Sequence, residues 1–214
     1  MKTIELFSGT KSFSKVMAHH GHSIFCVDNN ADLAPDLVAD IRTLRADDFP
    51  YRPDILWASP PCQGFSVAAL GKNWDHPSDE VYIPRTKSAR LSISLVEHTL
   101  RLITELEPIW YFIENPRAML RKMPHLRGLI RHTVTYCQYG DSRMKPTDIW
   151  TNADWWWPRP PCDQGAKCHE AAPRGSKTGT QGLKDATTRG AIPPALFEEI
   201  LGQLALAYRQ RRKT

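Results

Sequence analysis

The sequence predicts an α/β fold: a doubly wound, mostly parallel sheet that carries a small loop-rich insert. Two observations support this prediction. Short apolar runs alternate with helical patterns through the first half of the chain, which is the order of a sheet with helices wound on both faces. The runs are also almost continuously apolar, as in DILWA at 54–58 and IWYFIEN at 109–115. Parallel strands covered on both faces have this character, whereas half-exposed strands alternate apolar and polar residues.

The individual elements follow from the residue types along the chain. The predicted strands are 3–7, 23–28, 36–41, 54–58, 109–115, 133–139 and 147–152. The predicted helices are 12–21, 92–106 and a last one from Pro193 or Pro194 to about Arg209. The first helix ends near Gly21, a residue suited to a helix C-terminus. The segment 155–182 is rich in proline and glycine and is expected to be a loop.

Length and composition limit the class of protein. The chain has 214 residues, 41% of them hydrophobic, so residues 1–214 are expected to form a single domain with a sizeable core. No apolar run approaches the roughly 20 residues needed to span a bilayer. The start MKTIELFSG has no hydrophobic signal region, so we expect an intracellular, cytoplasmic protein without membrane contact. A net charge of +5 is compatible with a polyanionic partner but does not establish one.

Two chemically reactive side chains follow the ends of predicted buried strands. Cys62 stands on a proline-stiffened turn after the strand over 54–58, and Glu114 closes the strand over 109–115. A cysteine is a good nucleophile when its thiolate is favoured, and a carboxyl in an apolar site can hold a proton and act as an acid. Taken singly, the two residues are better explained as a half-buried thiol and a helix-capping acid.

Three further corners suit a cofactor that carries an adenosine. The turn LFSGTKS follows the first strand, and its Gly9 allows a tight turn into a helix. Asp28 ends the second strand about twenty residues later, where an acid can bind ribose hydroxyls. Asp40 ends the third strand. One glycine-containing turn on its own would be explained as a turn with a helix cap.

Together these motifs resemble the DNA cytosine-5 methyltransferase family, and they occur in that family's order. The matching segments are PPCQGFS at 60–66, FIENP at 112–116, ELFSGT at 5–10, VD at 27–28, ADI at 39–41, YGDSRMK at 139–145 and RGAIPPAL at 189–196. The resemblance implies the Rossmann-like fold of S-adenosylmethionine-dependent methyltransferases. It also implies an enzyme that methylates C5 of cytosine in DNA through a covalent bond between the cysteine and C6.

The resemblance assigns roles to individual residues. Cys62 would be the nucleophile and Glu114 the acid, while Arg143 and Lys145 would hold the base oxygen or the phosphate. The residues that would bind the cofactor are Phe7, Ser8, Gly9, Thr10, Ser12, Asp28, Asn29, Asp40, Ile41, Pro60, Ala191 and Ile192. A target cytosine in a duplex would have to be flipped out. Action on RNA such as tRNA, action on free nucleotides, and a binding module without turnover remain alternatives.

The chain departs from the family pattern at several places. Lys11 stands where the family has a second glycine, and a positive φ there would be strained. Gly190 replaces the usual asparagine of the last motif. The recognition region is reduced to 150–188, and 189–214 returns to the cofactor side. A short insert predicts a short or relaxed target sequence, or specificity supplied by a partner. We expect a monomer, and the compactness suggests a phage setting.

The segment 70–90 is expected to be a mobile lid over the nucleic acid. The residues expected to contact nucleic acid are Gln63, Ser66, Lys72, Arg85, Lys87 and Arg90. Trp74 or Tyr82 is a candidate for stacking on a base. A solvated surface loop is the alternative interpretation of the same segment.

The insert contains a candidate zinc site. The chain has five cysteines without a regular framework, which favours free thiols or a metal over disulfides. Cys162, Cys168 and His169 are three soft ligands close together in the sequence. A fourth ligand, either Cys137 or His132, would have to come from elsewhere in the fold. The alternative is a loop with two incidental cysteines. The run WWW at 155–157 is expected to pack under this loop.

Overall fold

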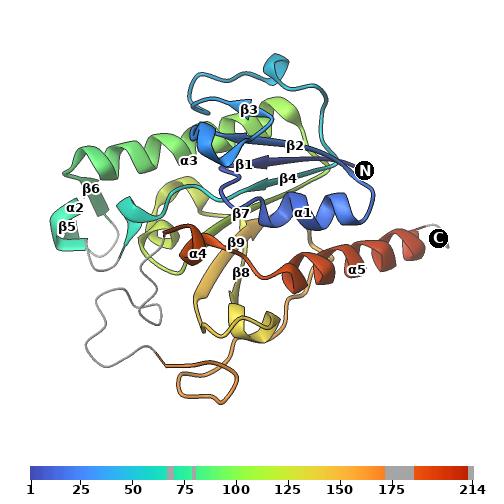
Figure 1. Ribbon diagram of the computed structural model, residues 1–214. Coiled ribbons are helices and arrows are strands. Elements are labelled where there is room, and N and C mark those ends of the chain that lie inside the picture. The colour runs from blue at the N-terminus through green and yellow to red at the C-terminus, as the bar shows by residue number, and fades with distance from the viewer. Residues whose placement is uncertain (67–69, 79–80, 172–185, 212–214) are drawn as a thin grey trace.

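The computed structural model describes residues 1–66, 70–78, 81–171 and 186–211 (Figure 1). Its main sheet has the strand order β3-β2-β1-β4-β7-β9-β8. The strands of this sheet are β1 (Lys2–Leu6), β2 (Ser23–Asp28), β3 (Leu37–Val38), β4 (Ile55–Ala58), β7 (Trp110–Pro116), β8 (Ile130–Thr135) and β9 (Pro146–Thr151). The first five of them in the order are parallel, and β9 runs antiparallel to both of its neighbours. The predicted doubly wound, mostly parallel α/β fold is therefore confirmed.

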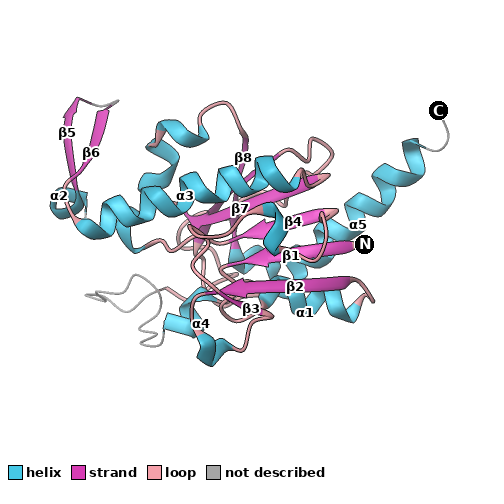
Figure 2. Cartoon of the chain, turned by 90° about the horizontal axis from the view of Figure 1, so that it is seen from above, coloured by secondary structure: helices cyan, strands magenta, loops and turns pink. Residues whose placement is uncertain are grey.

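Helices cover both faces of the sheet (Figure 2). The α-helices of the described residues are α1 (Ser12–His19), α2 (Leu70–Asn73), α3 (Lys87–Leu106), α4 (Ala186–Gly190) and α5 (Pro194–Arg211). Of these, α1 and α5 pack on one face of the sheet and α3 on the other. Side chains alternate along β4, because successive residues of a strand point to opposite faces. Ile55 and Trp57 pack in the cluster that contains α1 and α5. Leu56 and Ala58 pack in the cluster that contains the end of α3. This double burial explains why the β4 sequence is apolar throughout.

Several predicted boundaries were wrong, each for a local reason. The helix α3 begins at Lys87 instead of 92, because the Thr86 hydroxyl accepts a hydrogen bond of 3.2 Å from Ala89 N and caps it. The strand predicted over 133–139 ends at Thr135. A 3-10 turn (Tyr136–Tyr139) follows, closed by bonds of 3.3 Å from Gly140 N to Cys137 O and 3.2 Å from Asp141 N to Tyr136 O.

The segment predicted as a mobile lid has regular secondary structure in most of its described residues, so the alternative interpretation as a surface loop was wrong, and its role as a lid stays a prediction. It contains α2 and an antiparallel hairpin of β5 (Trp74–Ser78) and β6 (Val81–Pro84). Trp74 is 1% exposed, and its indole N–H donates a 2.8 Å bond to Gly64 O. The prediction that Trp74 stacks on a base was therefore wrong, because its ring is part of the core under the hairpin.

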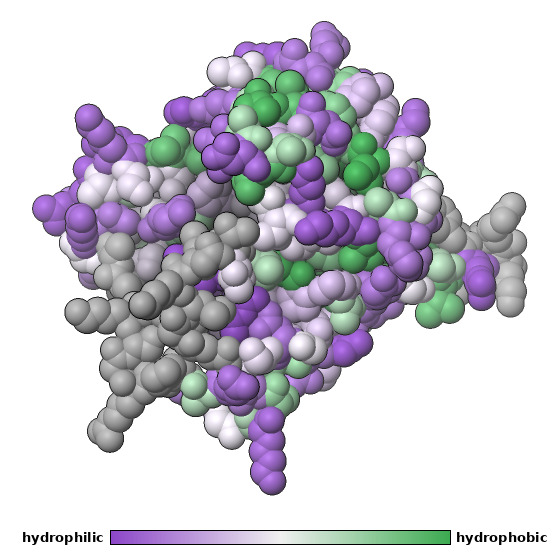
Figure 3. Space-filling model, viewed as in Figure 1, coloured by the Kyte–Doolittle hydropathy of each residue, from purple (hydrophilic) through white to green (hydrophobic). Residues whose placement is uncertain are grey.

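The surface mixes polar and apolar residues on the face shown in Figure 3. Among the described residues, no helix combines the length and the apolar character that crossing a membrane requires. The described cysteines are all free thiols. Trp156 is fully buried, as expected of the tryptophan run, whereas Trp157 is 73% exposed and does not pack under the loop.

Candidate active site

The ends of β4 and β7 bring the two reactive side chains to the same edge of the sheet. Ala58 pairs with Ile113 in parallel register, so the residues that follow leave the sheet side by side. The Asn115 side chain donates a 2.8 Å bond to Pro60 O, which fastens the proline turn to β7. This bond sets the position of the backbone that carries Cys62, and such strand ends are where ligand sites of α/β proteins lie.

Cys62 is half-buried at the start of a 3-10 turn over Gln63–Phe65. The turn lies close against α3, and a Cβ on Gly64 would approach Ser92 Oγ to 2.2 Å. Glycine is therefore required at this position. Burial raises the pKa of the Cys62 thiol, the Glu114 charge raises it further, and the Lys145 charge lowers it. The thiol thus interacts electrostatically with both groups.

Glu114 is 5% exposed, and its carboxyl accepts a 2.9 Å hydrogen bond from the Tyr136 hydroxyl. Burial raises the pKa of Glu114, while Lys145 and the Tyr136 bond lower it. A buried carboxyl with a raised pKa can keep a proton near neutral pH. Tyr136 was not among the predicted site residues, because it lies far from Glu114 in the chain. The pairing of β7, β9 and β8 brings the two residues together.

Lys145 lies close to the two groups just described. Its Nζ donates a 2.8 Å bond to Arg189 O and stands 4.6 Å from the centre of the Tyr136 ring. Burial lowers the pKa of Lys145, whereas the Glu114 and Cys62 charges raise it. Cys62, Glu114 and Lys145 therefore form one electrostatic group, in which the charge of one residue shifts the pKa of another. Their separate roles in catalysis stay predictions.

Arg143 makes a different set of contacts. Its Nε donates to the Asp141 carboxylate at 2.8 and 3.1 Å. Its terminal nitrogens donate to the carbonyls of Thr188, Arg189 and Ala191 at 3.1 to 3.2 Å. The side chain is 6% exposed, as the ion pair with Asp141 keeps it inside. In this arrangement Arg143 ties the segment after β8 to the last motif, and its contact with a base stays a prediction.

The turn after β1 is a tight turn that is bonded to the Asp28 carboxylate at the end of β2. Gly9 N donates a 2.9 Å bond to the Asp28 carboxylate, which also accepts a 3.0 Å bond from Asn30 N. The residues Phe7, Gly9 and Lys11 all have positive φ. Lys11 has a φ of 56°, which is the positive φ that was expected to be strained for a lysine in place of glycine. Its Nζ contacts Ala34 O, across the corner that Asp28 borders.

The last motif, over 189–196, contacts the start of α1 beside this turn. Ile192 N donates a 3.2 Å bond to Ser12 Oγ, which also bonds Thr10 Oγ1 at 2.7 Å. A cavity of about 470 Å³ is lined by Thr10, Ser12, Lys15, Val16, His19, Ala191, Ile192, Pro194 and Glu198. Four of the predicted cofactor-binding residues thus share one cavity, whose volume is typical of ligand pockets at roughly 300–1,000 Å³.

The remaining predicted cofactor residues differ in accessibility. Ser8 is 3% exposed, and its buried hydroxyl has no hydrogen-bond partner among the described residues. Asn29 is exposed, whereas Ile41 is 3% exposed and belongs to the core under α3. The Asp40 carboxylate accepts bonds from Arg42 Nε at 2.9 and 3.0 Å, and this contact lowers the pKa of Asp40. Ser8 is not among the residues that line the cavity. Its orphaned hydroxyl is a separate polar group that fits a polar cofactor bound at this turn.

The residues predicted to contact nucleic acid lie near α3 and the hairpin. Gln63, Lys72 and Lys87 are exposed, and Ser66 is half-buried. Two of the cations already have protein partners. Arg85 lies 3.4 Å from the Asp75 carboxylate, and Arg90 donates to the carbonyls of Pro84 and Arg85 at 3.2 and 3.0 Å.

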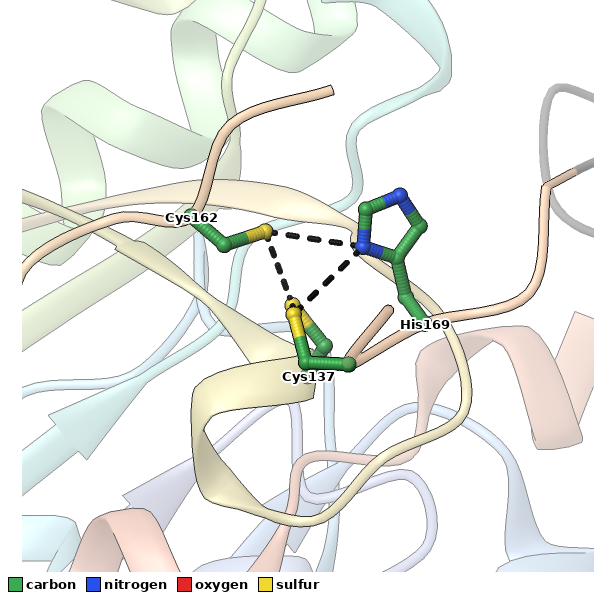
Figure 4. A group of neighbouring side chains, drawn as sticks. Cys137, Cys162 and His169 are labelled. Atoms are coloured by element: carbon green, nitrogen blue, oxygen red, sulfur yellow. Dashed lines mark hydrogen bonds between the residues drawn. The ribbon is translucent and has the colours of Figure 1, made fainter. Parts of the chain in front are cut away.

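The predicted metal ligands come together in the fold (Figure 4). Cys162, Cys168 and His169 meet Cys137, and their ligand atoms all lie within 4.8 Å of one another. The alternative fourth ligand, His132, instead packs its ring against Trp156 at a centroid distance of 5.2 Å. Cys137 is therefore the residue that completes the cluster.

Comparisons with known proteins bear on the family of this chain. Residues 1–129 match the family described as C-5 cytosine-specific DNA methylase. A probable DNA (cytosine-5)-methyltransferase of Frog virus 3 (isolate Goorha) is 28% identical over 229 residues, which cover 94% of this chain and 99% of the relative.

Solved structures are similar in fold. The Entamoeba histolytica methyltransferase EhMeth has a TM-score of 0.52 at 13% identity, over 71% of this chain and 52% of its own. A putative DNA modification methyltransferase encoded within a prophage in E. coli has a TM-score of 0.48 at 17% identity, over 71% of this chain and 46% of its own. The chain thus matches about half the length of these two structures. The likeness to EhMeth supports the methyltransferase fold.

Proposed function

The chain belongs to the family of C-5 cytosine-specific DNA methylases, and we infer from this that it is a DNA cytosine-5 methyltransferase in which Cys62 is the nucleophile and Glu114 the acid. The observation that supports these roles is the joining of the β4 and β7 ends. It sets a half-buried thiol and a buried, protonatable carboxyl in one electrostatic group with Lys145.

The cofactor site that we propose lies between the β1–α1 turn and the last motif. S-adenosylmethionine, when bound, supplies the electrophilic methyl group that C5 of the base accepts. Asp28 has oxygens for ribose hydroxyls beside its bonds to Gly9 N and Asn30 N. Ser8 offers a buried hydroxyl that has no partner within the described chain. These groups fit the polar part of such a cofactor.

In the reaction that we propose, the Cys62 thiolate forms a bond to C6 of the cytosine. The electron pair of the C5–C6 double bond then becomes available at C5, which takes the methyl group. Glu114 donates a hydrogen bond or its proton at N3, so that negative charge does not build up on the ring. Lys145, held by Arg189 O, stabilises the thiolate and the developing negative charge. Loss of the C5 proton to water re-forms the double bond and expels the thiolate, and a proton given to N3 returns to Glu114. The products are 5-methylcytosine in the DNA and S-adenosylhomocysteine.

For the partner, we propose duplex DNA with the target base flipped out, because buried atoms of a stacked base cannot reach Cys62. Exposed Lys72 and Lys87 at the two ends of the hairpin segment are the cations that we assign to phosphates. The insert over 150–188 lies partly outside the described residues. We propose that the target sequence is short, or that a partner supplies the specificity. We further propose that the protein is a monomer in the cytoplasm. We also propose a structural zinc ion in the insert.

A mechanism-based trap tests the residue roles. In an oligonucleotide with 5-fluorocytosine, C5 carries fluorine in place of the proton that must leave, so the enzyme stays bonded to C6 after methyl transfer. We expect an adduct that survives denaturing electrophoresis, requires S-adenosylmethionine and is lost in Cys62→Ala. Cys26→Ala is the matched control, because it removes a thiol of β2 that contacts Ser14 and should keep the adduct. An adduct retained by Cys62→Ala would refute the assignment of the nucleophile.

A further inference from the structure

Four soft ligand atoms converge outside the proposed active site. The Cys137 and Cys162 sulfurs are 3.0 Å apart, and the Cys168 and Cys137 sulfurs are 3.6 Å apart. His169 Nδ1 lies 3.6 Å from the Cys162 sulfur and 3.7 Å from the Cys168 sulfur. Figure 4 shows the labelled side chains turning these atoms toward a common centre.

These separations approach the edges of a tetrahedral zinc site. With Zn–S bonds of about 2.3 Å and a Zn–N bond of about 2.0 Å, tetrahedral angles put sulfurs about 3.8 Å apart and a sulfur and a nitrogen about 3.5 Å apart. Three of the four measured separations, at 3.6, 3.6 and 3.7 Å, differ from these values by about 0.2 Å. The Cys137–Cys162 pair at 3.0 Å would have to open by about 0.8 Å.

The four ligands come from two segments that are distant in the sequence. Cys137 lies in the 3-10 turn after β8, whereas the other three lie in the loop that follows β9. Two hydrogen bonds from backbone N–H groups of this loop already hold it beside β8 and the segment after the turn. Cys162 N donates to Thr135 Oγ1 at 2.9 Å, and Glu170 N donates to Ser142 O at 2.8 Å. An ion at the cluster would therefore fix a loop whose two ends are already in place.

We propose that Cys137, Cys162, Cys168 and His169 bind a structural Zn²⁺ ion that fastens the insert to the turn after β8. Three thiolates and one imidazole are a closed ligand set with no position left for water or substrate, which is the pattern of structural and not of catalytic zinc. The ion would replace weak thiol contacts in a loop of low apolar content, where small irregular segments commonly depend on a metal.

The turn held by the ion also carries a residue of the proposed active site. Tyr136 precedes Cys137 and donates to Glu114 at 2.9 Å. Ser142, which accepts the bond from Glu170 N, precedes Arg143. Loss of the ion should therefore lower methyl transfer through misplacement of these residues. This consequence rests on the proposed function, whereas binding of the ion does not.

The test measures metal in the full chain purified without chelators. We expect about one zinc ion per protein chain by inductively coupled plasma mass spectrometry. Cys137→Ser and His169→Ala should each lose at least half of this zinc. Cys62→Ser is the matched control, because it removes a thiol outside the cluster and should keep the zinc. Substitution with Co²⁺ should give the visible and thiolate charge-transfer absorption of a tetrahedral site with sulfur ligands.

A second measurement covers variants that fail to fold. The wild-type chain should release its zinc to a strong chelator, and proteolysis between 158 and 171 should then become several times faster at unchanged global fold. Wild-type protein without bound zinc, or without tetrahedral Co²⁺ absorption, would overturn the proposal whatever its methyltransferase activity. A Cys137–Cys162 disulfide in freshly purified protein, seen as a mass lower by both thiol hydrogens, would overturn it too. Zinc without methyl transfer would instead contradict the proposed function.

Discussion

A buried carboxylate on β1 makes the stability of the protein depend on pH in a direction opposite to that of most acidic groups. Glu5 is 4% exposed. Its carboxylate accepts bonds from Phe13 N at 3.3 Å and Ser14 N at 3.0 Å at the start of α1. Burial nevertheless outweighs these bonds and raises the pKa of Glu5 from 4.5 to about 7. The glutamine in Glu5→Gln has a similar shape and cannot ionise.

The sign follows from where the proton is bound more tightly. The folded protein holds the Glu5 proton up to about pH 7, whereas the unfolded chain releases it near pH 4.5. The stability from this group is therefore complete below about pH 4.5 and is lost as the pH rises through about 7. A pKa change from 4.5 to about 7 corresponds to about 3 kcal/mol in total. About 2 kcal/mol of this falls between about pH 5.5 and about pH 8.5.

Urea denaturation followed by tryptophan fluorescence at several pH values measures this effect. The unfolding free energy of the wild type, relative to that of Glu5→Gln, should fall by about 2 kcal/mol from about pH 5.5 to about pH 8.5. Glu107→Gln is the control, since the Glu107 side chain is 64% exposed and its removal should leave the curve parallel to the wild type. Parallel curves for wild type and Glu5→Gln would refute the reasoning, because they would mean that Glu5 ionises alike in both states.

Three further predictions concern the site and its flanks. Alkylation of Cys62 by iodoacetamide should keep accelerating up to pH 9 without a plateau, because burial raises the thiol pKa above its ordinary 9.0, and Glu114→Gln should move the rise to lower pH. Tyr136→Phe should lower the unfolding free energy by about 1 kcal/mol. It should also shift the alkaline limb of the pH–rate profile to higher pH, because the Tyr136 hydroxyl bond lowers the pKa of Glu114 and its removal raises that pKa. An unshifted limb would show that Tyr136 is only structural. Lys11→Gly should be about 1 kcal/mol more stable than Lys11→Ala in thermal unfolding, because φ is 56° at this position; equal stabilities would contradict the strain.

The sequence was informative where burial dictates residue type. The β4 run is apolar at every position because Trp57 and Leu56 face opposite, helix-covered sides, and a pattern of this kind predicts a parallel strand. The Cys62 turn and the end of β7 could be placed at one edge for the same reason, since parallel strands end together. The hairpin was missed because β5, with the sequence WDHPS, contains Pro77 and lacks the composition of a strand. β6 has the β-rich sequence VYI, but this run is only three residues long and mostly exposed, so it gave too weak a signal.

Contacts between distant segments could not be derived from the sequence, which left Cys137 and His132 as equal candidates for the fourth ligand. Tyr136 reaches Glu114, and Cys137 reaches Cys162, only because β8 pairs with β9 and β9 with β7. No local spacing encodes these approaches. The commitment of Arg143 to Asp141 and to the carbonyls of the last motif is of the same kind, since it depends on how a loop and the C-terminal segment close over the sheet.

The most direct test of the central claim measures transfer of labelled methyl from S-adenosylmethionine to unmethylated duplex DNA, with tRNA and dCMP in parallel. Wild-type protein should label DNA and leave the other two unlabelled, and Cys62→Ser should label none of them while still binding the cofactor. Label on DNA from Cys62→Ser would contradict the covalent role of Cys62. Label only on tRNA or dCMP, or none on any substrate from wild-type protein that binds the cofactor, would contradict the assignment as a DNA cytosine-5 methyltransferase.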